Sequence, residues 1–356
     1  MNSFLGRLIF GFFCFCTCFS LQGVLHAVNA AAPDMASFKP APLFGSKAIS
    51  EKTLPNGVRG LVRSSAGSGL VCVQVWVKAG ARYEGDNNSG VSRLLAEAGL
   101  NGSKNYPRRS EAGGTLRGGA RESLETIGGD VKTFTSRDAT FWSVTIASSY
   151  LPQALRAFSD AVLRPDLSSE SVAEAREDVA GQQRRRESDA LDASLDIAYR
   201  LAFEKHPYRK PAGGTSHSIE TVTANLARSY HQTRFVGPNI SVVVVGEASP
   251  IETQALIAQF FSDAPGKATT TNQVGTTPEI APPAFKTLAR RFATQNKVVT
   301  LGFRAPGMNN PTDVVATDVL LSHWKEGEAA HLKSVLLGLT NDNDEDEADS
   351  PPNSSE

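Results

Sequence analysis

The same order of predicted elements occurs twice in this 356-residue chain, at 71–97 and again at 297–324. Each stretch starts with a β-branched run, VCVQVWV or VVTLGF, and passes through a turn that contains two consecutive asparagines. Each then continues into a segment with the apolar spacing of an amphipathic helix. A repeated order of elements indicates a duplicated structural unit, so we expect two related units rather than one large core.

Strands and helices alternate irregularly along the chain. We expect two adjacent strands at 54–63 and 69–80, a strand pair at 131–148 and a closing strand at 238–247. Helices are expected at 89–103, from about Ser171 to Glu204, and at 225–235, and the Gly- and Arg-rich stretch 105–123 is expected to be a loop. Ser171 and Glu174 have the spacing of a capping box. This mixture predicts an α+β fold in which helices pack on a largely antiparallel sheet.

Composition shifts divide the chain into six segments. They are a signal peptide at 1–30, a linker at 31–49, a first α+β domain at 50–263, a linker at 264–284, an incomplete second copy at 285–339 and an acidic tail at 340–356. The second linker is rich in Thr, Pro and Gly, and the tail carries too little apolar surface to fold, so we expect it to be disordered.

The first thirty residues have the layout of a secretory signal. A short positive start, MNSFLGR, precedes an apolar run and then small residues suited to cleavage near Ala30 to Ala32. We expect a secreted or periplasmic protein without a stable membrane span after cleavage. An uncleaved membrane anchor is the alternative, because the apolar run approaches spanning length.

The charge balance argues against a nucleic-acid partner. The chain has 36 basic and 37 acidic residues, and the basic residues form no long stripe that would follow a phosphate backbone.

The helix expected at 89–103 has one core-facing stripe. Its members lie at i, i+3, i+4 and i+7 and are Val91, Leu94, Leu95 and Ala98. Arg93, Ala96 and Glu97 are expected on the opposite side. Because Arg93 and Glu97 are four residues apart, we expect an exposed ion pair worth at most about 0.3–0.5 kcal/mol.

Six stretches together resemble one protein family, the insulinase/pitrilysin-type zinc peptidases, which include the mitochondrial processing peptidase subunits. They are LPNGVRGLV, VQVWVKAGARYE, SGVSRLLAEAGLNGS, IGGDVKTFTSRDATFWSVTI, HPYRKPAGGTSHSIETV and PNISVVVVGE. The likeness covers residues 50–250 and, in part, 283–339. It implies a pair of homologous α+β domains that enclose a peptide cleft.

Active members of that family carry an H-x-x-E-H helix and a further glutamate on a later helix. With Gly90 and Gly102 as anchors, the resemblance puts Arg93 and Glu97 at the two histidine positions and Ala96 at the general base. The third ligand falls at Gln182. Arginine stays protonated, alanine accepts no proton and neutral glutamine is a poor zinc ligand. The resemblance therefore implies no intact catalytic residue and no metal in this chain, with zinc expected only in an active partner.

The resemblance also assigns residues to the substrate cleft. The cleft's edge strand would hold Lys132, Thr133, Phe134 and Thr135. Lys132 and Thr133 replace the small or amide residues that usually stand there, so peptide docking is expected to differ.

These features support three hypotheses about function. The first is a non-catalytic subunit that partners an H-x-x-E-H-bearing subunit in processing a peptide or unfolded protein. The second is a stand-alone periplasmic peptide-binding protein that adds a strand at the sheet edge. The third is a metalloendopeptidase with a rearranged site, or an incomplete gene product. The third has little support, because no H-x-x-E-H or H-E-x-x-H string occurs and the histidines at 206, 217, 231, 323 and 331 are scattered.

Overall fold

The computed structural model describes residues 49–110, 116–266, 286–293, 298–302, 305–306 and 310–326. The chain divides into two compact units, one of residues 25–288 and one of residues 1–24 with 289–356, and each is described separately. The expected signal peptide at 1–30 and acidic tail at 340–356 lie outside the described residues. Within them, no helix is both long and apolar enough to cross a membrane.

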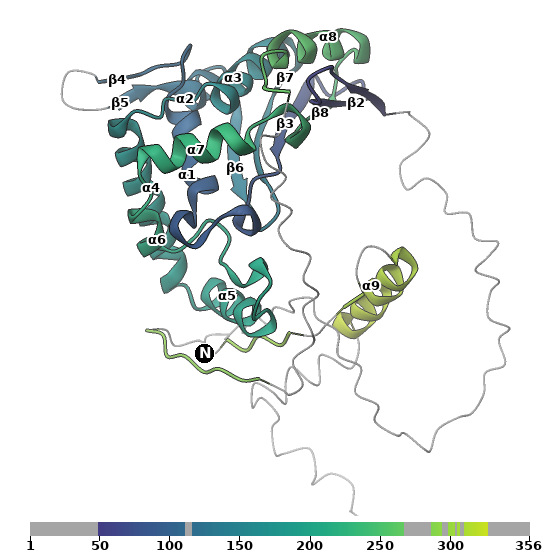
Figure 1. The fold of residues 1–356 in the computed structure, drawn as a ribbon. Helices are drawn as coiled ribbons and strands as arrows, with labels where there is room; N and C mark the ends of the chain where they lie inside the picture. The colour runs from purple at the N-terminus through teal and green to yellow at the C-terminus, as the bar shows by residue number, and fades with distance from the viewer. Residues whose placement is uncertain are drawn as a thin grey trace, which may run out of the picture. The chain divides into compact units, whose positions relative to one another are not determined.

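The first unit is built on a six-stranded mixed sheet in the order β1-β2-β8-β3-β7-β6 (Figure 1). The strands are β1 (Ser50–Thr53), β2 (Arg59–Ser64), β3 (Leu70–Val77), β6 (Asp130–Thr135), β7 (Thr140–Ala147) and β8 (Ile240–Gly246). Only the β2–β8 pairing is parallel. The sheet is therefore largely antiparallel, as the sequence predicts.

The prediction that β2 and β3 are adjacent is wrong. β8 lies between them, with Val244 opposite Val62 on one side and Val73 on the other. β2 and β3 run in opposite directions as a hairpin would, but they are spread apart to admit β8. Its run of valines suits a central position with neighbours on both sides.

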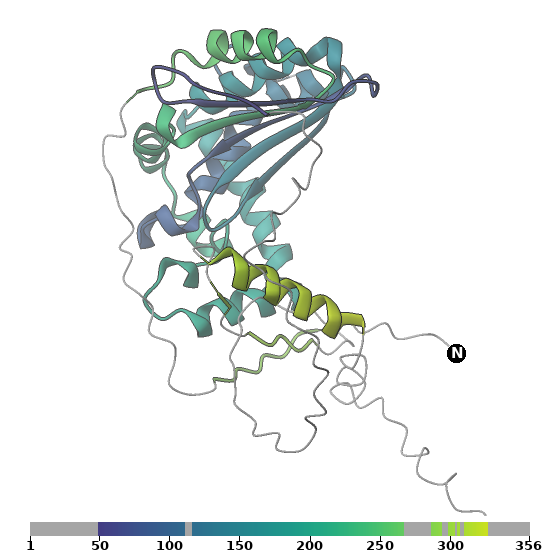
Figure 2. The same ribbon diagram turned by 90° about the vertical axis from the view of Figure 1, so that its right-hand side faces the viewer.

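Helices cover one face of the sheet, the face hidden behind the strands in Figure 2. Side chains on that face of β3 (Val71, Val73, Val75 and Val77) are at most 1% exposed, whereas those between them are half-buried. The helices are α1 (Val91–Asn101), α2 (Gly119–Glu125), α3 (Leu151–Leu163), α4 (Ser169–Ser188), α5 (Ala190–Ala202), α6 (Ser216–Glu220), α7 (Ala224–Arg234) and α8 (Pro250–Phe261). α1, α3 and α8 contact the strands, while α4 and α7 pack against α1.

The structure corrects two further predictions. The helix expected from Ser171 to Glu204 is two helices, because the side chain of Asp189 accepts hydrogen bonds from the backbone of α5 and starts it afresh. The first of them begins earlier than predicted, with Ser168 rather than Ser171 as its N-cap.

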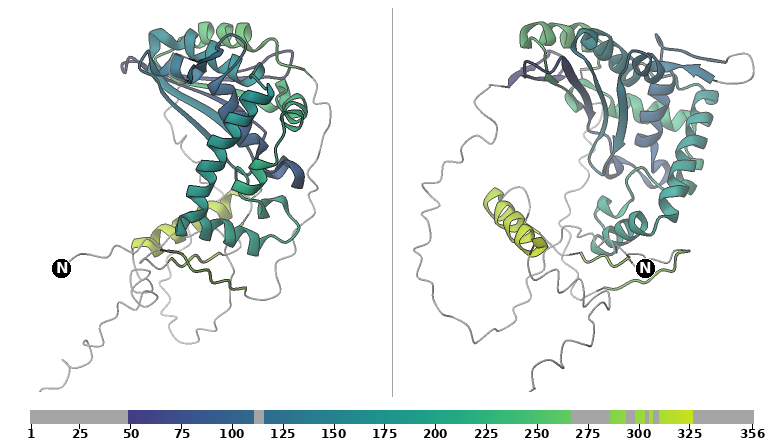
Figure 3. Two further views of the ribbon diagram at one scale, coloured as in Figure 1. Left: turned by 90° about the vertical axis from the view of Figure 1, so that its left-hand side faces the viewer. Right: turned by 180° about the vertical axis from the view of Figure 1, so that it is seen from behind.

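The stretch 105–123 is not simply a loop. It contains a small hairpin of β4 (Arg108–Ser110) and β5 (Leu116–Gly118) and the start of α2. The rear view in Figure 3 shows this hairpin at the upper right.

The second unit contains α9 (Pro311–Glu326), where the repeated pattern predicts a helix. The strand expected before it is not observed at residues 298–301, which are described but lie in no strand. The incomplete second copy at 285–339 therefore stays a prediction.

Candidate functional site

The helix that carries Arg93 and Glu97 is buried on nearly all sides. Nine of the eleven residues of α1 are buried, and Ala96 is fully buried in the main hydrophobic core. Its carbonyl oxygen accepts a hydrogen bond of 3.1 Å from Nε1 of Trp142. The predicted polar face is therefore wrong, because β6, β7, α4 and α7 surround α1 where the periodicity implied solvent.

A buried carboxylate fixes the start of α1. Glu84 accepts hydrogen bonds from the backbone nitrogens of Gly90, at 2.6 Å, and Ser92, at 3.0 Å. Burial raises the pKa of Glu84, against the effect of these bonds, which lower it. Gly90 has φ of 94°, and a Cβ there would lie 2.2 Å from Cδ1 of Ile219. This position therefore requires glycine, both for its backbone conformation and for the close approach of α6.

Arg93 is the centre of a polar cluster. Its Nη2 lies 2.8 Å from Oε1 of Glu97 and donates a 2.8 Å hydrogen bond to Oε1 of Gln182 on α4. Its Nη1 donates to Oγ1 of Thr133 on β6 at 3.0 Å. The structure thus brings together three of the four candidate positions from two helices, while Ala96 packs in the core.

The other oxygen of Glu97 pairs with a second arginine. Nη2 of Arg121 on α2 lies 2.9 Å from Oε2 of Glu97. The side chain of Glu97 is 9% exposed, and those of Arg93 and Arg121 are 22% and 29% exposed. The expected ion pair between Arg93 and Glu97 is present, but it is largely buried rather than exposed. Sequence reasoning missed Arg121, which lies in the stretch assigned to a loop and has no periodic relation to Glu97.

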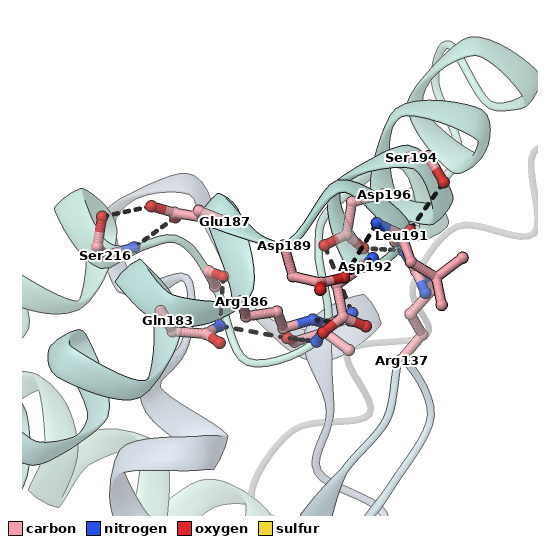
Figure 4. A network of polar contacts seen from close by, with 12 residues as sticks. Arg137, Gln183, Arg186, Glu187, Asp189, Leu191, Asp192, Ser194, Asp196 and Ser216 are labelled. Carbon is pink, nitrogen blue, oxygen red and sulfur yellow. Dashed lines mark hydrogen bonds and ion pairs between the residues drawn. The ribbon is translucent and has the colours of Figure 1, made fainter. Parts of the chain in front are cut away.

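The end of α4 is anchored to the start of α6 and to the segment before it (Figure 4). Nε2 of Gln183 donates to the carbonyl of Gly214 at 2.6 Å, and Glu187 accepts from both the backbone and the hydroxyl of Ser216 at 2.8 and 2.7 Å. Arg186 also donates to the carbonyl of Ala212 at 3.2 Å. These bonds hold α4 in the register that turns Gln182 toward Arg93.

Two of the four expected cleft residues are exposed. Lys132 pairs with Asp130 at 2.5 Å, and Phe134 is 54% exposed on the sheet face that lacks helices. Thr133 is half-buried and bonded to Arg93. Thr135 is 6% exposed and shares a 3.2 Å hydrogen bond with Thr140, so its side chain is directed into the fold.

The residues around Arg93 do not fit a zinc ion. Zinc in proteins takes imidazole, thiolate or carboxylate ligands. Both oxygens of Glu97 already pair with guanidinium groups, and the permanent charge of Arg93 would repel a cation. In the described part of the chain, no group of three or more His, Cys, Asp or Glu side chains could hold a metal.

The described histidines form no alternative site. Nε2 of His231 lies 2.8 Å from the carbonyl oxygen of Val162, and burial lowers its pKa. Nδ1 of His206 accepts from the backbone of Tyr208 at 3.2 Å. The side chain of His323 and all of His331 fall outside the described residues.

Comparison with known proteins shows which family this chain resembles. The model of the insulinase peptidase family M16 matches residues 61–216, and that of the M16 inactive domain matches 221–341. An uncharacterized zinc protease of Mycobacterium tuberculosis is 27% identical over 75% of this chain. The Arabidopsis thaliana probable mitochondrial-processing peptidase subunit beta is 23% identical over 62%, and the Bos taurus cytochrome b-c1 complex subunit 1 is 23% identical over 80%.

The chain spans 59%, 40% and 58% of the lengths of these three relatives, respectively. Among solved structures, a protease from Helicobacter pylori has the same fold, with a TM-score of 0.56 and 21% identity over 66% of this chain and 55% of its own. The first half of the Escherichia coli periplasmic protease PqqL has a TM-score of 0.53 and 24% identity over 62% and 47%. Since both family models match in order and together cover most of the chain, this protein belongs to the insulinase family of peptidases, M16.

Proposed function

We propose that this chain is a non-catalytic member of the insulinase family that serves as the partner subunit of an active zinc peptidase. One observation carries the proposal. The guanidinium of Arg93 binds Glu97 and Gln182. These three residues stand where the resemblance expects the zinc ligands. A guanidinium stays protonated and does not bind water as a zinc ion does, so it cannot generate the attacking hydroxide. The carboxylate of Glu97 is already paired with two guanidinium groups.

The retained fold supports a role for the chain beyond catalysis. α1 packs in the core, has a capped start and lies beside β6. These features are intact although the resemblance implies that the residues needed for hydrolysis are replaced. Two of the similar proteins are named as subunits, one of a mitochondrial processing peptidase and one of the cytochrome b-c1 complex. Assembly with another chain is thus a known arrangement for similar proteins, and the partner we propose carries an intact H-x-x-E-H helix.

The proposal is tested by affinity purification of the tagged full chain from its native host. We expect mass spectrometry to recover a protein with an H-x-x-E-H helix, and the two purified chains together to cleave denatured casein faster than either alone. Hydrolysis by this chain alone that is lost on chelation would contradict the proposal. We also propose that the protein is secreted or periplasmic, because residues 1–30 have the layout of a secretory signal. Fractionation of cells of the native host tests this location.

A further inference from the structure

The direction of the backbone groups on β6 follows from its hairpin with β7. The nitrogen of Ser136 donates to the carbonyl of Ala139 at 2.8 Å, and Phe134 is paired with Phe141. In an antiparallel pair, hydrogen-bonded residues alternate with residues whose N–H and C=O groups point away from the partner strand. Lys132, Phe134 and Ser136 therefore bond to β7, and the backbone groups of the residues between them point to the free edge.

That free edge belongs to the last strand of the sheet, since β6 follows β7 in the strand order and no other strand of the described residues pairs with it. Two carbonyl oxygens on the edge already have side-chain donors. Nη1 of Arg93 donates to the carbonyl of Thr133 at 3.3 Å, and Nη1 of Arg121 donates to the carbonyl of Val131 at 3.4 Å. Both arginines also bind Glu97, so one carboxylate holds the two guanidinium groups in place.

We propose that Arg93 and Arg121, held by Glu97, close the free edge of β6 to the addition of an extended peptide strand. A strand that joins an edge must donate its N–H groups to the outward carbonyls, and here two successive outward carbonyls already accept a hydrogen bond from an arginine. Exposed edges invite unwanted pairing, and charged side chains are a known means of preventing it. The inference rests on the hydrogen-bond pattern of β6 and not on the proposed partner role.

The closure gives peptide binding an extra cost. An incoming strand would compete with both arginines for these carbonyls, and moving either arginine aside would disturb its pairing with a carboxylate that is 9% exposed. If the peptide replaces one of these charge-assisted arginine–carbonyl hydrogen bonds, the lost bond weakens peptide binding by about tenfold to a hundredfold. We therefore expect the native edge to bind an extended peptide at least about tenfold more weakly than an opened edge.

The test compares three variants of the full chain. Arg121→Ala frees the carbonyl of Val131 and leaves Glu97 paired with Arg93. A triple variant, Arg93→Ala/Glu97→Ala/Arg121→Ala, frees both carbonyls without leaving a buried carboxylate unpaired. Arg59→Ala is the matched control, because Arg59 is also an ion-paired arginine of this sheet, but it lies on β2, which β8, β3 and β7 separate from β6.

The probe is a fluorescein-labelled peptide of alternating threonine and valine with Gly-Ser ends, and its binding is followed by anisotropy. We expect a several-fold tighter complex with Arg121→Ala, about tenfold or more with the triple variant, and no change with Arg59→Ala. Hydrogen exchange should show the amides of Val131 and Thr133 protected by the peptide in the opened variants only.

Two results would overturn the proposal. One is wild-type binding as tight as that of the opened variants, with protection of the same β6 amides. The other is the absence of any gain in a variant that circular dichroism shows to be folded. If the triple variant does not fold, Arg121→Ala decides the question by the same two measurements.

Discussion

Arg93 and Gln182 lie 89 positions apart in the sequence, yet they share a hydrogen bond of 2.8 Å. The contact joins α1 to α4 at the centre of the cluster formed with Glu97, Thr133 and Arg121. The guanidinium groups of Arg93 and Arg121 supply the positive charge that balances the carboxylate of Glu97. Glu97 is thus neutralised by the protein itself, which explains how it remains nearly buried in the fold.

The burial of the Arg93–Glu97 pair predicts a coupling energy larger than that of a surface ion pair. We expect a double-mutant cycle with Arg93→Ala and Glu97→Ala, measured by urea unfolding, to give about 1–3 kcal/mol, because both groups are withdrawn from water. The matched control is Arg59 with Glu51, a pair 2.6 Å apart whose side chains are 51% and 49% exposed. Its cycle should give less than about 1 kcal/mol. Equal coupling energies in the two cycles would show that burial does not strengthen the Arg93–Glu97 interaction.

A methyl group at Gly90 should destabilise the protein through the close approach of α6. Gly90 and Gly67 have similar φ values of 94° and 98°, but a Cβ at Gly67 would meet nothing within 4 Å. We expect Gly67→Ala to lower the free energy of unfolding by about 1–2 kcal/mol, from backbone strain alone. Gly90→Ala should lower it by a further 1–3 kcal/mol or so, from the clash with Ile219. Chemical denaturation measures both values, and equal losses would refute the steric argument.

His231 should make the protein less stable at mildly acidic pH. Burial lowers its pKa in the folded state from the ordinary value of 6.5. As the pH falls below 6.5, the unfolded chain therefore binds a proton that the folded chain does not, and the free energy of unfolding decreases. Well above pH 6.5 the imidazole is neutral in both states, and this loss of stability is absent. The ring also stacks on Phe235, with centroids 4.6 Å apart.

Replacement of His231 by phenylalanine keeps a ring and removes the titration. We expect the stability of the wild type relative to His231→Phe to fall as the pH is lowered from about 7.5 to about 5.5. Urea unfolding at several pH values gives this difference directly. A difference that rises as the pH falls would mean that the folded state favours the charged imidazole.

Local patterns predicted most of the elements of the first unit. The alternation at 131–148 corresponds to β6 and β7, and the apolar spacing at 89–103 corresponds to α1. Both signals depend on the period of a single element and on nearby turn residues. The insertion of β8 between β2 and β3 depends instead on pairing between segments about 180 residues apart, which no local pattern contains.

Only part of the candidate site could be predicted, again because local patterns do not contain long-range contacts. The spacing of Arg93 and Glu97 predicts their contact, because neighbours on one helix are fixed by its geometry. Burial of Glu97 and its second partner, Arg121, could not be predicted, since one helical period indicates one core-facing side and α1 has neighbours on several. The placement of Gln182 came from the family resemblance, and the structure puts this residue in contact with Arg93.

Zinc binding tests the central claim most directly. Purified wild-type chain and the triple variant Arg93→His/Glu97→His/Gln182→Glu are each dialysed with zinc, and bound metal is measured by mass spectrometry. We expect far less than one equivalent in the wild type, and about one in the variant, which would supply two imidazoles and a carboxylate. Circular dichroism checks that the variant is folded. About one equivalent of tightly bound zinc in the wild type would contradict the account of Arg93 as the resident cation of this site.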